Sequence, residues 1–290
     1  MKNEVFISTG NNKKKNIIST IKAFVKHDIK NIELSGGNYK ENKILKKELL
    51  KLKKKYSLNF LIHNYFPPER KKIVLNLGTL NKKIYDETIN FYEKSIKFGI
   101  DIGSKYYAIH AGFLFDPVEK ELGRTIKSRQ LYDCEKSITN LKRGYLHLKS
   151  YSKKKIKIFL ENNVISYNNY KNFRCNPFHL TNFKDFLQLR KEFKFDILLD
   201  IAHLKVSSRT LKRSFKNEIR KFKNYTNYIH LSSNNGFTDS NESLIGDNNY
   251  LKLILKNFQK NNYITTEVYG KNSDQISSYL YVKKKMNQNV

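Results

Sequence analysis

Eight side chains that could bind a metal ion follow short apolar runs in this sequence or stand in the loops just after them. They are His63, His110, Glu161, Asp200, His203, His230, Asp239 and Glu267. Mixed imidazole and carboxylate ligands suit Zn, Mn, Mg or Co, and without a thiolate the set does not select one of these metals. The residue types therefore predict a divalent-cation site, and with it metal-assisted catalysis.

The clearest of these places is the apolar run Ile197–Leu199, which ends in Asp200 and is followed by His203. Its length and composition are typical of a strand buried on both faces. If the strand belongs to a parallel sheet, both polar side chains lie at its carboxyl end, on the ligand side of the fold. The alternative is a structural turn, in which Asp200 caps a helix and His203 packs beside it.

Glu161 and Glu267 each follow an apolar run directly. A carboxylate buried at such a place needs an ion pair, hydrogen bonds or a metal ion, because removing its charge from water is costly. Together with Asp200 and His230, the two glutamates can surround one ion from four neighbouring strands and leave positions free for substrate oxygens. An open site of this kind is typical of catalytic metal ions.

Apolar runs alternate with amphipathic segments along the chain, which predicts how these side chains are positioned. The expected strands are Glu4–Ser8, Asn31–Ser35, Leu58–Ile62, Tyr106–Ile109, Ile156–Leu160, Ile197–Leu199, Tyr225–Ile229 and Tyr263–Thr266. The expected helices are 12–27, 41–56, 82–99, 132–148, 182–193 and 250–261, with one more near the C-terminus. Eight such units predict an α/β fold, a closed (β/α)8 TIM barrel that residues 1–290 form as a single domain. A doubly wound open sheet is the alternative, but it would not gather the ends of strands three to eight around one cleft.

The composition bounds the class of protein and its compartment. Hydrophobic residues make up 39% of the chain, which suffices for a core, and no run approaches the roughly 18 apolar residues of a membrane span. Cys134 and Cys175 lack metal-ligand spacing and are too few for a disulfide framework. The N-terminus lacks the apolar stretch of a secretory signal. We therefore expect a cytoplasmic protein that does not enter a membrane, with its homo-oligomeric state left open.

The net charge of +30 favours a polyanionic partner such as nucleic acid. However, Lys, Asn, Ile, Phe and Tyr are all abundant while Trp is absent and Pro numbers only 4, a pattern expected from A/T-rich coding DNA. Many lysines also fall in helix-like runs, such as the segment 46–55, whose outer face would be solvated. We interpret the charge as mainly compositional and keep nucleic acid as the second choice of partner.

A series of short motifs carries a resemblance to a known family. In chain order they read NIELSGG, HNYFPP, VLNLG, YYAIHAG, FLENN, LLDIAH, YIHLS and ITTEV. Together they resemble the xylose isomerase-like TIM-barrel superfamily, which contains sugar and sugar-phosphate isomerases and epimerases as well as the endonuclease IV type of apurinic DNA repair enzyme. The resemblance covers nearly the whole chain, and it implies a (β/α)8 barrel with metal-dependent chemistry.

Similarity to the epimerase branch implies one divalent ion held by Glu161, Asp200, His230 and Glu267. It also implies that the two glutamates transfer protons, as base and acid, while the metal stabilises an enediolate of a sugar or sugar phosphate. His63, His110 and His203 would then contact the substrate. The family often has an arginine after the seventh-strand histidine, and the segment LSSNNGFTD contains none.

Similarity to the endonuclease branch implies three zinc ions and cleavage at apurinic or apyrimidinic sites in DNA. His63 and His110 match the first site, and Glu161 bridges it to the second. The third needs His203, Asp239 and a histidine where this chain has Asn241, a poor zinc ligand. An isomerase or epimerase is therefore the first hypothesis and an endonuclease the second. A barrel that binds carbohydrate or a partner without turnover is the third.

Overall fold

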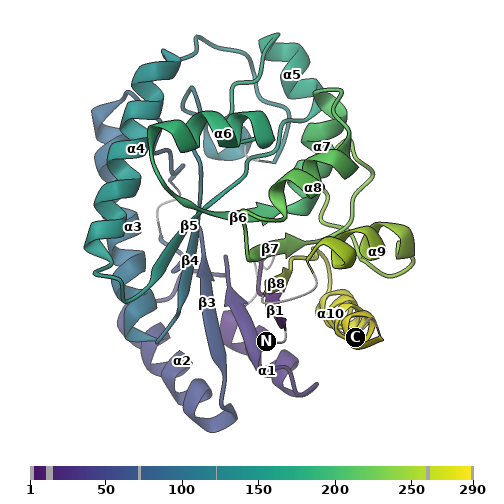
Figure 1. Ribbon diagram of the computed structural model, residues 1–290. Helices are drawn as coiled ribbons and strands as arrows, with labels where there is room; N and C mark the ends of the chain where they lie inside the picture. The colour runs from purple at the N-terminus through teal and green to yellow at the C-terminus, as the bar shows by residue number, and fades with distance from the viewer. Residues whose placement is uncertain (1–2, 11–15, 71–72, 122, 259–261, 289–290) are drawn as a thin grey trace.

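A computed structural model describes residues 3–10, 16–70, 73–121, 123–258 and 262–288. Eight parallel strands form a closed barrel in chain order, as the sequence predicts (Figure 1). The strands are β1 (Glu4–Ser8), β2 (Asn31–Leu34), β3 (Asn59–His63), β4 (Tyr106–His110), β5 (Lys157–Glu161), β6 (Asp196–Asp200), β7 (Tyr228–Leu231) and β8 (Tyr263–Thr266). The barrel closes where β8 pairs with β1, so no strand edge is left open.

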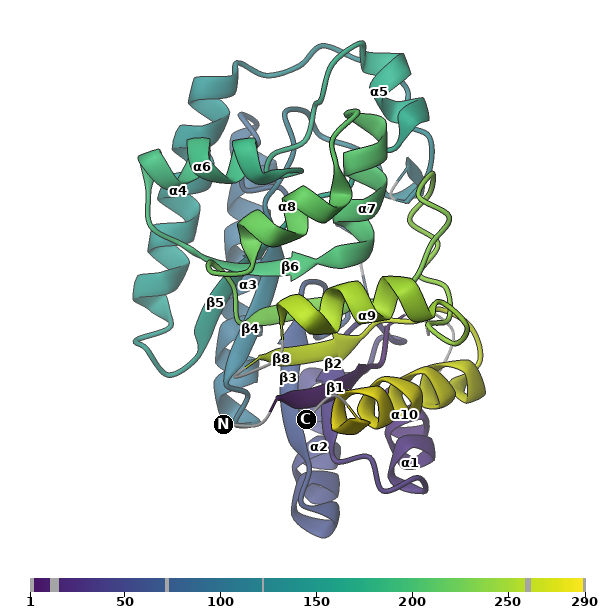
Figure 2. The ribbon, with the colours of Figure 1, turned by 45° about the vertical axis from the view of Figure 1, so that its right-hand side comes forward.

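Helices surround the barrel and connect successive strands. They are α1 (Ile17–Val25), α2 (Asn42–Tyr56), α3 (Lys82–Asp101), α4 (Cys134–Tyr151), α5 (Tyr167–Phe173), α6 (Phe183–Glu192), α7 (Ile201–Thr210), α8 (Phe215–Phe222), α9 (Asn248–Asn257) and α10 (Asn272–Gln288), with a short 3-10 helix at Glu119–Glu121. Figure 2 shows α10 alongside α1 and β1, where the end of the chain meets its beginning. Two predicted helices extend outside the described residues. The start of the helix expected at 12–27 and the end of the helix expected at 250–261 lie there.

Helix α2 shows how the lysine-rich segments fold. Leu45, Leu49 and Leu52 form its buried stripe. Lys47, Lys51 and Lys54 lie on the opposite side and are exposed. The helix ends at Ser57, which adopts the left-handed conformation with φ 53°. Helices α5 and α8 were not predicted from the sequence, and α7 was considered only as an alternative. The buried part of α5 is the single polar residue Asn169, so no apolar stripe marks it.

Side chains of each strand alternate between the barrel interior and the helix layer. On β5, Ile158 and Leu160 pack in the main core against the helices, whereas Phe159 belongs to a separate cluster inside the barrel. Glu161, two residues after Phe159, therefore points inward as well. The same alternation applies to β3, β4, β6 and β7. On each of these strands an imidazole or carboxylate follows, two residues later, an apolar or aromatic residue of the interior cluster.

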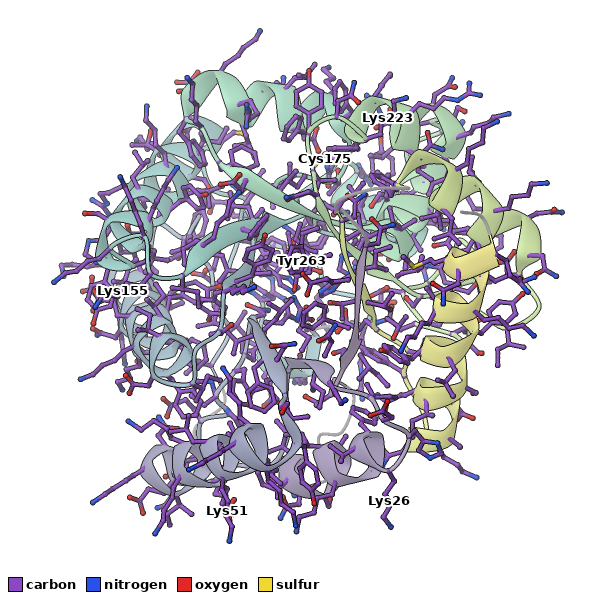
Figure 3. All side chains as sticks on the ribbon, turned by 60° about the horizontal axis from the view of Figure 1, so that its bottom comes forward. Lys26, Lys51, Lys155, Cys175, Lys223 and Tyr263 are labelled. Carbon is purple, nitrogen blue, oxygen red and sulfur yellow. The ribbon has the colours of Figure 1, made fainter. Side chains whose placement is uncertain are left out.

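Aromatic rings fill the amino-terminal end of the barrel. Tyr106 lies with its ring centroid 4.5 Å from that of Tyr263 and 4.8 Å from that of Phe159. Phe159 and Tyr228 meet edge to face at 5.2 Å. In Figure 3, Tyr263 lies near the centre of the barrel while the labelled lysines lie at the periphery. These rings fill the interior at this end, so we expect a ligand to bind at the carboxyl end of the barrel.

Among helices in the described ranges, none is long and apolar enough to cross a membrane.

Candidate metal centre

Four side chains from neighbouring strands converge at the carboxyl end of the barrel. Glu161, Asp200, His230 and Glu267 each offer one ligand atom, and these atoms all lie within 4.8 Å of one another. All four side chains are buried. Glu161 and Asp200 are the last residues of their strands rather than the first residues after them. Their backbones still pair with the neighbouring strands, opposite Leu198 and His230, so the sheet register fixes their positions.

Two carboxylate oxygens in this group lack a hydrogen-bond donor. Glu161 Oε1 and Asp200 Oδ2 are buried, and neither accepts a hydrogen bond from any residue that the structure describes. Buried carboxylate oxygens without a partner are costly, by roughly 1–3 kcal/mol or more each. Three carboxylates and one imidazole fit a divalent cation of the Mn, Mg, Zn or Co type. The donor set therefore fits a metal ion, which would satisfy both oxygens.

The two oxygens of Asp200 have different surroundings. Oδ1 accepts a hydrogen bond of 2.7 Å from the backbone N–H of His203 and so caps α7, while Oδ2 faces the other ligands. Asn162 holds the backbone of Asp200 from both sides, through bonds of 2.7 and 3.0 Å. The helix cap and the ligand are thus one residue. Burial, together with the charges of Glu161 and Asp239 and against the charge of His203, raises the pKa of Asp200 to about 7.

His230 presents its Nδ1 atom to the carboxylates. This atom lies 2.8 Å from Glu267 Oε2, 3.6 Å from Glu161 Oε1 and 3.9 Å from Asp200 Oδ2. Burial opposes a charge on the ring, but the surrounding carboxylates, Glu33 and Glu267 first, raise the pKa of His230 well above its usual value. A cation bound between these oxygens would take the place of that proton.

His63 and His110 form a second set of ligand atoms around the other oxygen of Glu161. Their Nε2 atoms lie 2.7 and 3.1 Å from Glu161 Oε2. Burial lowers the pKa of His110 to about 4, so its ring is neutral at pH 7. For His63 burial acts in the same direction, but the charge and hydrogen bond of Glu161 raise its pKa overall. Glu161 thus belongs to both sets, and its two oxygens face different partners.

His203 and Asp239 lie at the rim of this centre. His203 donates from Nδ1 to Asn162 O at 2.7 Å, and its Nε2 lies 3.2 Å from Asp239 Oδ2. The Asn241 side chain instead accepts a hydrogen bond of 2.8 Å from Ser232 Oγ, and its backbone has a φ of 47°. The Asn241 amide oxygen is therefore used in a hydrogen bond within the loop. His203 and Asp239 remain as two candidate ligands, whereas the endonuclease pattern requires three.

Two residues of the centre were missed in the sequence. Glu33 is fully buried inside the barrel, where Tyr228 O–H and Thr265 Oγ1 donate to its Oε2 and His230 Nε2 lies beside it. Asn162 orients Asp200 and His203. A signal for Glu33 did exist, because a charged residue between Ile32 and Leu34 in a buried strand must point away from the helix layer.

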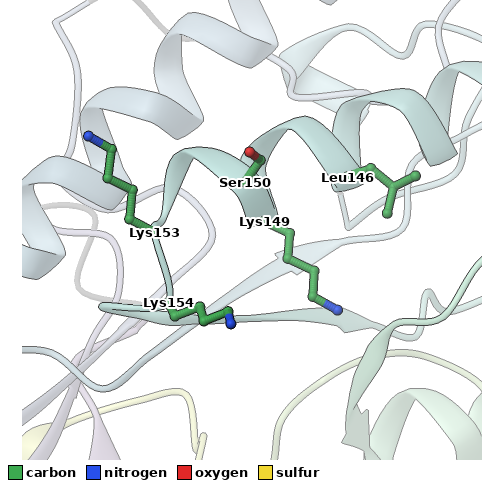
Figure 4. Close-up of a pocket in the computed structure, with 5 residues that line it drawn as sticks. All are labelled: Leu146, Lys149, Ser150, Lys153 and Lys154. Atoms are coloured by element: carbon green, nitrogen blue, oxygen red, sulfur yellow. The ribbon is translucent and has the colours of Figure 1, made fainter.

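A surface hollow elsewhere on the molecule lacks these ligand types. Leu146, Lys149, Ser150, Lys153 and Lys154 line it, at the C-terminal end of α4 (Figure 4). That end of α4 leads into the start of β5, whereas Glu161 is the last residue of β5. The hollow therefore lies toward the opposite end of the barrel from the metal centre.

Comparison with solved structures shows several proteins with the same fold. A D-tagatose 3-epimerase-like protein has a TM-score of 0.73 and 18% identity, with 100% of this chain and 99% of that chain covered. The 3-keto-D-glucoside 4-epimerase of E. coli in its apo form has a TM-score of 0.67 and 11% identity, covering 99% and 100%. Endonuclease IV from Thermus thermophilus has a TM-score of 0.62 and 12% identity, covering 100% of both chains.

Sequence comparison gives the family. None of the curated protein sequences matches this chain. The sequence model of a protein family described as "Xylose isomerase-like TIM barrel" matches residues 21–279. The matched range runs from α1 into α10 and contains all eight candidate ligand residues. The chain therefore belongs to the xylose isomerase-like TIM barrel family.

Proposed function

We propose that this protein is a divalent-metal-dependent isomerase or epimerase of a sugar or sugar phosphate. The observation that carries the proposal is the group of Glu161, Asp200, His230 and Glu267, which places two glutamates on one candidate cation site. The epimerases among the similar structures support the same reaction class. When bound, a divalent cation would act as a Lewis acid toward the carbonyl and adjacent hydroxyl of the substrate.

The two glutamates would move the proton. Burial opposes ionisation of Glu161, but the charges of His63 and His110 and the hydrogen bond from His63 lower its pKa well below the usual value. Glu161 is therefore ionised at neutral pH and can accept a proton from the carbon next to the carbonyl. Glu267, which follows β8 and lies 2.8 Å from the same Nδ1 atom of His230, would return a proton to the substrate.

The histidines around the centre would hold the substrate. His110 is half-buried at the carboxyl end of β4, and its neutral ring can donate one hydrogen bond and accept another. His203 already donates from Nδ1 to Asn162, which leaves Nε2 to face Asp239 and the substrate. His63 and its ion pair with Glu161 would hold the base in place.

The test is exchange of a carbon-bound substrate proton with deuterated solvent. Purified protein is incubated with Mn, Mg, Co or Zn and a panel of ketoses, aldoses and their phosphates, and exchange is followed by NMR and mass spectrometry. We expect exchange with at least one sugar and none with Glu161→Gln. Glu93→Gln is the matched control, because Glu93 pairs with His147 on the outer face of the barrel. Exchange with no member of the panel would contradict the proposal, and sugar binding without exchange would support a binding protein instead.

A zinc-dependent apurinic or apyrimidinic endonuclease is the second candidate. It is favoured by the second ligand set, because His63 and His110 both approach Glu161 Oε2, and by the basic net charge. This candidate predicts incision of a duplex containing one abasic site, loss of incision on chelation and a steep dependence on salt. Intact abasic DNA after incubation at low salt with zinc would remove it.

A further inference from the structure

Glu33 lies beneath the proposed metal centre, on the interior side of β2. Its register partner on β3 is Leu61, two residues before His63, so the carboxylate lies one interior position deeper in the barrel than that imidazole. The side chain is 0% exposed. Because it comes from the middle of a strand, Glu33 faces the interior floor of the site rather than the open mouth.

Three donors converge on this carboxylate. Tyr228 O–H and Thr265 Oγ1 donate to Glu33 Oε2, the latter at 2.8 Å. His230 Nε2 lies 2.9 Å from Oε1 and 3.1 Å from Oε2. All three donors come from β7 and β8, on the other side of β1 from Glu33. The arrangement holds the carboxylate against the Nε2 side of the His230 ring.

The two ring nitrogens of His230 face different groups. Nε2 faces Glu33, whereas Nδ1 faces Glu267, Glu161 and Asp200. A neutral imidazole carries one N–H and one lone pair, and the partner of one nitrogen decides which tautomer is present. A carboxylate on Nε2 places the N–H there and leaves the Nδ1 lone pair to the ligand group.

We propose that Glu33 is a positioning residue for the metal centre, which sets the tautomer and ring plane of His230 so that Nδ1 binds the cation. Tyr228 and Thr265 hold Glu33 in turn. The proposal rests on the proposed metal site but does not depend on which reaction the site carries out. A carboxylate on the far nitrogen of a metal-binding histidine also makes that histidine a better donor, and its loss typically weakens metal binding about 10- to 100-fold.

A direct role as a ligand is the competing explanation. One ligand atom each of Glu33, His63 and His230 lies within 4.8 Å of the others. A cation there would use His230 Nε2 and Glu33 Oε1, which accepts no hydrogen bond from a described residue, because Oε2 already accepts from Tyr228 and Thr265. It would also leave Nδ1 facing three carboxylates without a metal ion.

The test compares Mn²⁺ and Co²⁺ affinities, by calorimetry without substrate, in the full-length protein and its variants. Glu33→Gln keeps the shape of the side chain and removes the charge, so we expect its affinity to fall about 10- to 100-fold. Thr265→Val removes one support of Glu33 and should weaken binding less, in the same direction. Glu93→Gln is the matched control and should bind as the wild type does.

Two further measurements separate positioning from ligation. In ¹⁵N-histidine-labelled protein loaded with diamagnetic Zn²⁺, the proton of His230 should be on Nε2. In Glu33→Gln we expect the Nε2–H signal to weaken or to broaden. In the Co²⁺-saturated protein, the visible absorption bands should keep the wild-type pattern in Glu33→Gln, because no ligand is lost.

Wild-type metal affinity in Glu33→Gln would overturn the proposal, and so would a change in coordination number. If Glu33→Gln does not fold, the same outcomes apply to Thr265→Val. Absence of sugar exchange in the wild type would overturn the proposed function and leave this result unaffected.

Discussion

Two groups of candidate ligands differ in what holds them. We call Glu161, Asp200, His230 and Glu267 the strand-end group and His203, Asp239 and Asn241 the rim group. The strand-end group is carried by β5, β6, β7 and the residue after β8, where ladder pairing such as that of Asp200 with His230 fixes the spacing. The rim group is carried by α7 and the loop after β7, where Asn241 bonds to Ser232 and not to the other two.

The difference shows how position in the fold limits what a residue can do. Strand ends in a closed barrel are neighbours in space whatever the loops between them contain. A loop residue must be aimed by its own contacts, and those of Asn241 aim it at Ser232. The strand-end group therefore has the geometry of a binding site, whereas the rim group provides a pair of side chains that lines the site.

Substitution of Glu161 by alanine should have the largest effect, because this residue belongs to both ligand sets. We expect exchange to fall at least ~10³-fold, the scale of general acid–base catalysis, together with loss of the bound metal. The rate is measured by solvent deuterium exchange and the metal content by elemental analysis. His203→Asn, in the rim group, should keep its metal. Equal metal loss in both variants would remove the distinction between the groups.

The second largest effect is expected from removal of the metal, which should lower the Tm. A ligand at 100 times its Kd stabilises the folded state by about 2.7 kcal/mol, which in a chain of this size corresponds to roughly 4–5 °C in Tm. Calorimetric scans with Mn²⁺ and with a chelator measure the shift. The same scans of Glu161→Ala should show no response to metal. A chelator-independent Tm in the wild type would contradict a cation in the strand-end group.

The metal affinity should rise as the pH increases through 7. Burial raises the pKa of Asp200 to about 7, and a proton must leave before its carboxylate can bind a cation. His230, whose pKa is also raised, acts in the same direction. We expect a gain of about tenfold or more in affinity from pH 6 to pH 7, by calorimetry. A metal affinity that stays constant between pH 6 and pH 7 would contradict this prediction.

The same shift makes a prediction for the metal-free protein. Because the folded-state pKa of Asp200 lies above its unfolded value of about 3.9, the folded state binds more protons between the two values. The contribution of Asp200 to stability therefore decreases as pH rises from about 4 to about 7. Chemical denaturation of the metal-free Asp200→Asn variant should lack this part of the pH dependence.

Asn241→Ala should have the smallest effect. It removes the hydrogen bond with Ser232 and places alanine at a φ of 47°, so we expect a loss of about 1–2 kcal/mol in the free energy of unfolding. Denaturant titration measures this loss. Metal affinity should stay within about threefold of the wild type, since Asn241 is outside the strand-end group. A larger loss of affinity would show that the rim group also holds the cation.

The sequence determined the eight strands and their order, because short apolar runs and helical stripes are local properties of the chain. It also placed most of the candidate ligands correctly at strand ends. The strand boundaries were less well predicted. The seventh strand was expected at Tyr225–Ile229 and runs over Tyr228–Leu231. Ladder partners decide where a parallel strand begins and ends, and those partners lie far away in the chain.

Which side chains meet follows from the tertiary structure. Glu33 was overlooked because it lies inside a strand, and its partners Tyr228 and Thr265 are about two hundred residues away in the chain. The same holds for the two oxygens of Glu161, one facing His63 and the other facing His230. Residue type and periodicity can be read from neighbouring residues in the sequence. Distances between atoms of different strands depend on barrel closure and register, which are properties of the whole sheet.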